Sequence, residues 1–237
     1  MHIGCIIQAR LTSKRFPKKI FRKIKKKNII EIVNQRANKI KKVNKVIFAI
    51  PKNKKNNKLE KFLKKKKIKY FKGSEINVLS RYYAAAKKHD FDVIIRITSD
   101  CPLLDPHLCS KMLNYFLKNK YDYLSNILKR SYPVGLDCEI FTMNTLEKTF
   151  KKAKSKFDLE HVTPYMRNSK KFKIKNFYQN KKIEKQRWTL DYPLDFDFIK
   201  LAFLEFGAFK EFKWYRLYKL LKKNSKNKGY INQEYIT

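Results

Sequence analysis

This sequence of 237 residues has little of what marks a secreted or membrane-bound protein. It has no apolar run of about 18 residues or more, so we expect no transmembrane helix. Its N-terminus lacks the basic segment, apolar run and cleavage site of a signal peptide, so we expect a cytoplasmic protein. The four cysteines form no C-x-x-C pair and suit neither a zinc site nor a disulfide framework, which predicts thiols in or near the core: Cys5, Cys101, Cys109 and Cys138.

Acidic residues are also scarce, with 20 Asp and Glu against 58 Lys and Arg and a net charge of +38. Such an excess can indicate a nucleic-acid-binding or membrane-surface protein. Here the excess is mostly lysine, is spread along the chain and comes with many Asn and Ile residues. We therefore favour a composition bias that places lysine at ordinary surface positions, and keep nucleic-acid binding as an alternative.

Apolar residues make up 43% of the chain and aromatic residues 14%, which is enough for one sizeable core. Strand and helix patterns alternate through the first half. Strands are expected at 2–9, 45–50, 68–73 and 92–100, and helices at 28–43, 57–67, 77–89 and 106–119. Strands separated by helices of this length predict an α/β fold, with a mainly parallel central sheet and helices on both faces.

The pattern changes after residue 120. Segments 121–127, 135–141 and 172–178 are strand-like, and helices are expected at 143–154, 195–206 and 213–224. We predict a small mixed or antiparallel section here that faces the substrate. Since no Gly/Ser/Pro-rich linker is present, we predict one domain over 1–237.

Ligands of open parallel sheets sit at the carboxyl ends of the strands. Three polar stretches follow strands and should share this edge: 8–19, 73–81 and 98–105. The loop 8–19 contains no glycine, which excludes a Walker A motif. Its cations Arg10, Arg15 and Lys19 suit phosphate oxygens and Ser13 can donate a hydroxyl, so it predicts either an anion-binding loop or a solvated basic loop.

Two carboxylates are candidates for a metal site. Asp100 stands where an apolar strand stops, whereas Asp105, just before Pro106, is the better helix cap. Asp191 follows a short apolar run, and Asp195 is expected in the first turn of the next helix. Asp100 and Asp191 could share one Mg²⁺ whose other ligands are substrate phosphates.

Six stretches in order resemble the sugar-activating cytidylyltransferases, in the branch named for the spore coat polysaccharide cytidylyltransferase. They are IIQARLTSKRFPKKIF, FKGSEINVLSRYYAAAK, DVIIRITSDCPLLDP, YPVGLDCEIF, EHVTPYM and RWTLDYPLDFDFI. The resemblance covers nearly the whole chain, including the C-terminal helix and GYINQEY. Related enzymes make CMP-linked 3-deoxy-manno-octulosonate and CMP-linked sialic acids.

The resemblance implies a nucleotide-diphospho-sugar transferase fold (Rossmann-like), CTP as nucleotide, Mg²⁺ as cofactor, an acidic sugar as acceptor and a homodimer. It also implies that the single domain has a nucleotide-binding half (about 1–120) and a sugar-binding half with the C-terminal helices (121–237). It implies catalytic roles for Arg10, Lys19, Asp100 and Asp191, with Asp100 and Asp191 as metal ligands. The nucleotide-binding residues that it implies are Ala9, Arg10, Ser13, Arg15, Lys19, Gly73, Ser74 and Arg81. Three positions depart from the family pattern: Phe16 replaces leucine, and Lys18 and Ser99 stand where glycine is common.

The expected reaction is attack of a sugar oxygen on the α-phosphorus of CTP, with release of pyrophosphate. For the sugar we predict Asp137 and Glu139, two residues apart on one strand face, and His161. The alternative for Asp137 and Glu139 is a surface strand edge, and the alternative for His161 is a structural role. A sister enzyme that acts on a sugar or alditol phosphate remains open.

Overall fold

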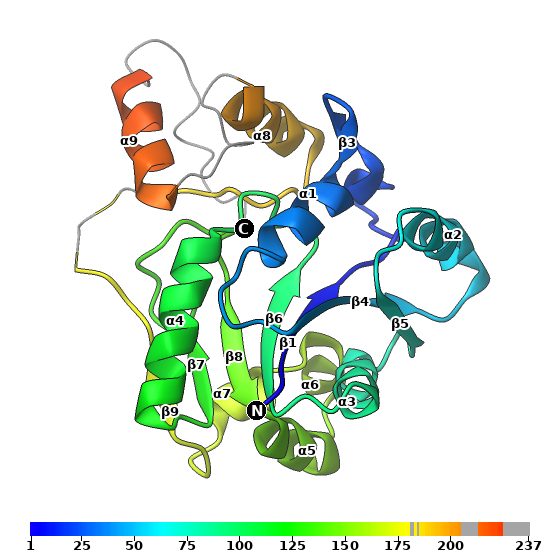
Figure 1. Ribbon diagram of the computed structural model, residues 1–237, viewed down its shortest axis with the longest axis vertical. Helices are drawn as coiled ribbons and strands as arrows, with labels where there is room; N and C mark the ends of the chain where they lie inside the picture. The colour runs from blue at the N-terminus through cyan, green and yellow to red at the C-terminus, as the bar shows by residue number, and fades with distance from the viewer. Residues whose placement is uncertain (181–182, 184, 205–212, 225–237) are drawn as a thin grey trace.

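The computed structural model describes residues 1–180, 183, 185–204 and 213–224. In the described residues, helices pack around one large sheet (Figure 1). The main strands are β1 (Ile3–Gln8), β4 (Lys45–Pro51), β5 (Tyr70–Gly73), β6 (Val93–Thr98), β7 (Tyr123–Ser125), β8 (Glu139–Thr142) and β9 (Ile174–Asn176). The longer helices are α1 (Ile29–Ala37), α2 (Asn57–Lys65), α3 (Val78–Lys88), α4 (Pro106–Asn119), α5 (Met143–Lys152), α8 (Pro193–Leu204) and α9 (Trp214–Asn224).

The seven strands are ordered β5-β4-β1-β6-β8-β7-β9, and β5 and β9 are the edges. Strand β1 pairs in parallel with both β4 and β6, and β7 pairs in parallel with β9. Strand β8 pairs antiparallel with both neighbours, β6 and β7. The predicted α/β fold is confirmed. The antiparallel pairing lies within the main sheet, so the strands of both halves of the chain form one sheet.

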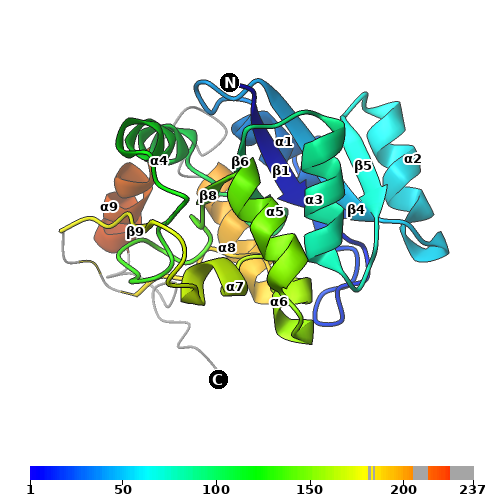
Figure 2. The ribbon, with the colours of Figure 1, turned by 90° about the horizontal axis from the view of Figure 1, so that it is seen from below.

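Side chains of β1 alternate between two apolar clusters, one on each face of the sheet. Ile3, Cys5 and Ile7 join the cluster beneath α1, α4 and α8, whereas Ile6 joins the one beneath α3 and α5. Figures 1 and 2 show these helix groups on opposite faces of the sheet. Gly4, between Ile3 and Cys5 in β1, leaves room for the ring of Phe91, because a Cβ on Gly4 would lie 2.1 Å from that ring. The predicted helices on both faces are therefore confirmed.

Several predicted boundaries were wrong. The helix expected over 28–43 ends at Ala37, because the chain turns there and Lys42 has a positive φ of 68°. Ile40 stays buried beyond the helix end, which explains why the apolar spacing continued. The end of the helix predicted over 195–206 and the segment GYINQEY lie outside the described residues.

Short elements were missed altogether. Strands β2 (Lys23–Ile24) and β3 (Lys27–Asn28) form a hairpin before α1, and α6 (Lys156–His161) and α7 (Pro164–Asn168) follow α5. Two single turns, η1 (Lys19–Phe21) and η2 (Lys54–Asn56), follow β1 and β4. Elements of two to six residues are too short for an apolar period to be visible.

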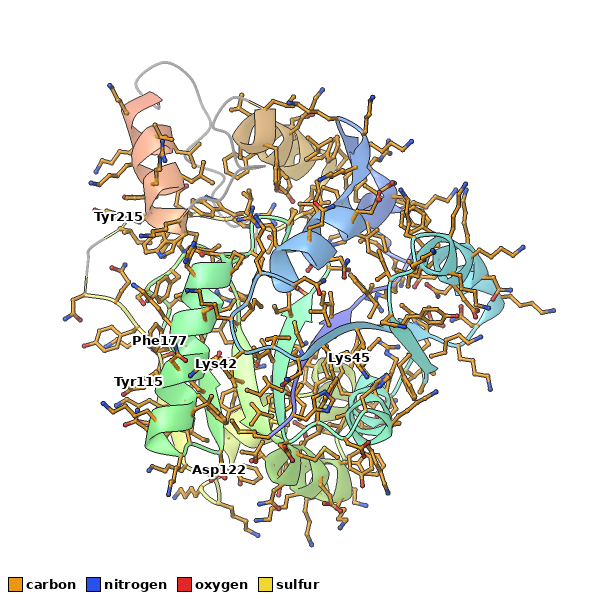
Figure 3. All side chains as sticks on the ribbon, in the orientation of Figure 1. Lys42, Lys45, Tyr115, Asp122, Phe177 and Tyr215 are labelled. Atoms are coloured by element: carbon orange, nitrogen blue, oxygen red, sulfur yellow. The ribbon has the colours of Figure 1, made fainter. Side chains whose placement is uncertain are left out.

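The helix cap Asp105 and the first-turn residue Asp195 were both predicted correctly, and Asp105 makes a further contact. Asp105 accepts hydrogen bonds from the first backbone N–H groups of α4 and also from the N–H of Trp214, 2.8 Å away, at the start of α9. On the same side of the molecule Tyr115 of α4 packs edge to face against Phe177, with ring centres 5.6 Å apart (Figure 3). Asp195 lies in the first turn of α8, as expected.

All four cysteines are buried free thiols, as predicted. Among the described residues, every helix is too short or too polar to cross a membrane.

Candidate active site

The loop after β1 is fixed from its inner side. Leu11 and Phe16 are buried, and the N–H of Leu11 donates to the side-chain oxygen of Asn56, 2.9 Å away. Thr12 donates to Glu75, which lies in the connection between β5 and α3. With its apolar side chains held inward, the loop presents Arg10, Lys14 and Arg15 outward as exposed cations. Phe16 fills the position of the leucine of the family pattern within the core.

A cleft of about 460 Å³ opens between this loop and the ends of β1 and β6. It is lined by Gln8, Ala9, Arg10, Thr12, Ser13, Lys14, Arg15, Lys19, Thr98, Ser99, Asp100, Glu160 and Asp191. Seven predicted site residues thus come together: Ala9, Arg10, Ser13, Arg15, Lys19, Asp100 and Asp191. Cations and carboxylates share one cleft at the carboxyl ends of parallel strands, which is where this architecture binds ligands.

Lys19 is the centre of the cleft wall. It is 8% exposed, and its Nζ lies 3.0 Å from Asp100 Oδ2, 2.9 Å from Asp191 Oδ1 and 2.6 Å from the carbonyl oxygen of Leu190. Burial alone lowers the pKa of Lys19, but the two carboxylates outweigh it and the pKa lies above its ordinary value. The side chain is therefore a charged ammonium in a nearly closed position.

Asp100 is held by its own strand end and by a distant segment. The hydroxyl of Thr98 donates to Asp100 Oδ1, and the backbone carbonyl of Asp100 accepts from the N–H of Leu190, 2.8 Å away. This backbone bond brings Asp191 beside Asp100 although they are far apart in sequence. Burial raises the pKa of Asp100, but the charge of Lys19 and the bond from Thr98 outweigh it and lower the pKa.

Asp191 is surrounded by cations. Its Oδ1 also accepts from Arg15 Nη2 at 2.8 Å, and its Oδ2 lies 3.5 Å from Arg187 Nη1. Asp195 fixes the turn, because its Oδ2 accepts from the N–H groups of Asp191 and Tyr192 at 2.7 and 2.8 Å while its Oδ1 pairs with Arg187. Arg15 and Arg187 also lie over the ring of Tyr192.

The carboxylate pair fits a magnesium ion if phosphate is also present. Asp100 and Asp191 each bring one oxygen within 3.0 Å of the same point, which is now the Nζ of Lys19. Among the described residues no group of three or more His, Cys, Asp or Glu side chains is placed to hold a metal. Mg²⁺ is commonly held by one or two carboxylates plus substrate phosphates and water, so two suffice in that setting. The metal role of this pair stays a prediction.

Gly73, Ser74 and Arg81 lie behind the cleft and do not line it. Arg81 is 1% exposed, and its Nη1 donates to the carbonyl of Ser74 at 2.6 Å. A Cβ on Gly73 would lie 2.9 Å from Arg81 Cγ, so glycine leaves room for this side chain. Burial lowers the pKa of Arg81 to about 10, and the charge of Arg10 contributes to the lowering. The three residues shape the wall next to Arg10.

The predicted sugar residues do not come together. Glu139 is 2% exposed and accepts from Tyr123, Thr163 and Arg96. Asp137 precedes β8 and pairs with Arg130, so the expected common strand face was wrong.

His161 is exposed at the end of α6, with its ring centre 4.5 Å from that of Phe157. Its neighbour Glu160 lines the cleft instead. The roles of Asp137, Glu139 and His161 in sugar binding stay predictions.

Several site residues were not selected from the sequence. Thr98 has a visible signal, because it lies two residues before Asp100 at the end of one strand and can share its face. Glu160 lay inside a quoted motif, where His161 was chosen for its chemistry. Arg187 opens the quoted motif RWTLDYPLDFDFI, but its pairing with Asp191 and Asp195 appears only after the turn has formed.

The comparisons with known proteins agree with this geometry. The family model described as cytidylyltransferase matches residues 4–234. The protein MJ1063 of Methanocaldococcus jannaschii is 40% identical over 201 residues, which is 83% of this chain and 81% of that protein. The spore coat polysaccharide biosynthesis protein SpsF of Bacillus subtilis is 30% identical over 210 residues, 85% of this chain and 86% of that protein.

Solved structures extend the likeness to the fold. A cytidylyltransferase from Leptospira borgpetersenii has a TM-score of 0.90 at 31% identity, covering 100% of this chain and 99% of that chain. A CMP:2-keto-3-deoxy-manno-octonic acid synthetase complexed with CTP has a TM-score of 0.67 at 14% identity, covering 85% of this chain and 98% of that one. The latter shows a shared fold alone.

Proposed function

This chain belongs to the cytidylyltransferase family, and on that premise we propose that it activates an acidic sugar with CTP, giving a CMP-sugar and pyrophosphate. The name of SpsF refers to spore coat polysaccharide biosynthesis, and the synthetase of the same fold acts on a keto-deoxy acid. We extend both to this chain: the acceptor is a sugar acid and the product serves a surface polysaccharide or glycan.

One observation carries the proposal: a single cleft at the strand ends combines exposed cations with a pair of converging carboxylates. Nucleotidyl transfer needs cations along the triphosphate and a means to orient the α-phosphate, and little other protein chemistry. Arg10 and Arg15 are the exposed cations that offset charge on the leaving pyrophosphate. Ser13 and the backbone of the loop add neutral donors.

Asp100 and Asp191 would hold Mg²⁺ together with phosphate oxygens, and the bound ion would supply electrostatic stabilisation of the α-phosphate. Thr98 and Asp195 keep the two carboxylates directed into the cleft. The acceptor oxygen forms a bond to the α-phosphorus while the bond to the β-phosphate oxygen breaks, and the hydroxyl proton leaves to solvent. The loop and the carboxylates hold the two reactants in line.

Pyrophosphate release from purified protein with CTP and Mg²⁺ tests the proposal. The acceptor panel contains keto-deoxy acids, sugar phosphates and alditol phosphates. We expect release with a keto-deoxy acid, and more of it with CTP than with ATP, GTP or UTP. The Asp100→Asn variant should release pyrophosphate about 10²-fold more slowly, or more slowly still. Release with phosphorylated acceptors alone would favour the sister activity on a sugar or alditol phosphate. Preference for a purine nucleotide would reject the proposal.

Two further measurements address the partners. Size-exclusion chromatography with light scattering tests the expected homodimer. Binding of a single-stranded oligonucleotide across a salt titration tests the nucleic-acid alternative. A steep loss of tight binding with salt, with no pyrophosphate release from any acceptor, would favour that alternative.

A further inference from the structure

The ammonium group of Lys19 lies where a divalent cation would bind. An ammonium has three N–H donors and no acceptor. The structure directs Nζ at three oxygens, those of Asp100, Asp191 and the carbonyl of Leu190. Lys19 therefore has no donor left for a phosphate while it stays in this position, and the two carboxylates have a cation between them already.

The surrounding charges balance without a metal. Three cations and three carboxylates form one connected group: Arg15, Lys19, Arg187, Asp100, Asp191 and Asp195. A free divalent cation meets no net negative charge in this group, and must displace the Lys19 ammonium to reach both carboxylates. Because Mg²⁺ also gives up its water reluctantly, the ligand-free chain is a poor magnesium site.

A triphosphate changes this balance. It brings several negative charges to the cleft, next to a lysine whose four-carbon stem is flexible. Lys19 begins the single turn η1, so its Nζ can move from the carboxylates to a phosphate oxygen without a change in β1 or β6. The metal ion that arrives with the nucleotide then replaces the positive charge of Lys19 beside the two carboxylates.

We propose that Lys19 makes the metal site depend on nucleotide: it excludes a free divalent cation and releases Asp100 and Asp191 only when phosphate oxygens draw it away. The proposal rests on the proposed function and adds an order to it, in which metal enters with the nucleotide. Lys19 thus selects the metal–nucleotide complex over the free ion.

The test uses Mn²⁺ alone as the probe, followed by electron paramagnetic resonance and by calorimetry. We expect the Lys19→Met variant to bind free Mn²⁺ at least tenfold more tightly than the wild-type protein. Lys14→Met is the matched control, because Lys14 is an exposed lysine of the same cleft and no carboxylate among the described residues contacts it. It removes the same charge, and its Mn²⁺ affinity should stay within twofold of wild type.

Two further samples locate the effect. Adding Asp100→Asn to Lys19→Met should abolish the gained affinity, which places the ion at this pair of carboxylates. The wild-type protein should bind Mn²⁺ at least tenfold more tightly with a non-hydrolysable CTP analogue than without it. This comparison uses no variant, so the absence of this gain overturns the proposal even where Lys19→Met fails to fold.

Equal affinity of Lys19→Met and wild type for free Mn²⁺ would overturn the proposal, as would an equal gain in both lysine variants. Wild-type protein that binds free Mn²⁺ as tightly as it does with nucleotide would also overturn it, provided that the analogue itself binds. If the analogue does not bind while Lys19→Met still gains affinity for Mn²⁺, Lys19 blocks the ion as proposed and the CTP assignment is rejected.

Discussion

Two ion pairs, one between strands β6 and β8 and one just beyond the end of β6, differ in how far solvent or a ligand can reach them. Glu139 of β8 pairs with Arg96 of β6, and their side chains are 3% and 13% exposed. Asp100, just beyond β6, pairs with Lys19, and their side chains are 29% and 10% exposed. The first pair is enclosed by Tyr123 and other core neighbours, whereas the second forms a wall of the cleft.

The chemistry of the two pairs is similar, so access accounts for the difference in expected role. A sealed pair keeps its partners, and removing one leaves a charge with no water to solvate it. A pair beside a cleft can exchange its partner for a ligand. We therefore expect the sealed pair to contribute mostly to stability and the open pair mostly to turnover.

The largest expected effect is on the sealed pair. Glu139→Gln leaves the charge of Arg96 buried and unpaired, and should lower the free energy of unfolding by about 3–5 kcal/mol at neutral pH. Turnover of the folded fraction should fall less than tenfold. Urea denaturation followed by circular dichroism measures the free energy of unfolding, and pyrophosphate release measures the turnover. A stability change below about 1 kcal/mol would mean that the two pairs do not differ.

The same substitution has a pH signature. Burial raises the pKa of Glu139, but Arg96, Thr163 and Tyr123 outweigh it, so the pKa is lowered in the folded chain. The resulting stability is present above the unfolded pKa of about 4.3 and is lost as pH falls through the lower folded value. The difference in unfolding free energy between wild type and Glu139→Gln should therefore narrow in this acidic range.

The next effect is on the open pair. Asp100→Asn and Asp191→Asn should each lower turnover about 10²-fold or more, equivalent to about 2.7 kcal/mol, with less than about 1 kcal/mol lost in stability. The double variant should be little worse than the worse single variant, because the two act as a unit. Steady-state pyrophosphate release across a Mg²⁺ titration is the measurement. Near-wild-type activity of Asp191→Asn at low Mg²⁺ would remove Asp191 from the metal site.

Arg10 differs from both pairs, because it lines the cleft and has no hydrogen-bond or ion-pair partner among the described residues. Arg10→Ala should weaken CTP binding by about 1.5–3 kcal/mol, the value of a charge-assisted contact, and leave stability unchanged. Calorimetric titration with CTP measures it. Lys61→Ala, which removes an exposed cation from α2, is the control and should bind CTP as wild type does.

The smallest effect concerns the backbone that carries Lys19. Lys18 has φ 56° and ψ 23°, a left-handed conformation that glycine adopts without cost. This explains why glycine is common here in the family pattern. Lys18→Gly should stabilise the chain by about 1 kcal/mol and leave turnover within twofold, as seen by urea denaturation and pyrophosphate release. A loss of stability would show that the turn depends on the lysine side chain.

The fold was largely predictable because each long element carries its own period. Strands β1 and β6 are apolar runs that end in polar residues, and parallel pairing then brings those ends together. This placed Arg10, Lys19 and Asp100 at one edge of the sheet before any contact was known. The short apolar run before Asp191 made it a candidate, but its place beside Asp100 depends on a backbone bond between Leu190 and Asp100 that the sequence does not show.

The remaining misses are pairings between distant residues. Whether Glu139 faces a sugar or an arginine depends on Arg96, Tyr123 and Thr163, which come from three other segments. Nothing in the sequence near Glu139 distinguishes these cases. In the same way, Glu160 reaches the cleft because α6 is placed beside it, and a helix of six residues gives no pattern to read.

The two open edges of the sheet show what the excess of lysine does elsewhere in the molecule. Among the described residues, β5 and β9 each have a neighbouring strand on one side alone, and the open row of backbone groups on such an edge is a template for pairing between molecules. Each edge carries an exposed lysine, Lys72 in β5 and Lys175 in β9. A charge on an edge strand opposes the addition of a strand from another molecule, so we expect these two lysines to hinder edge-to-edge aggregation of the sheet.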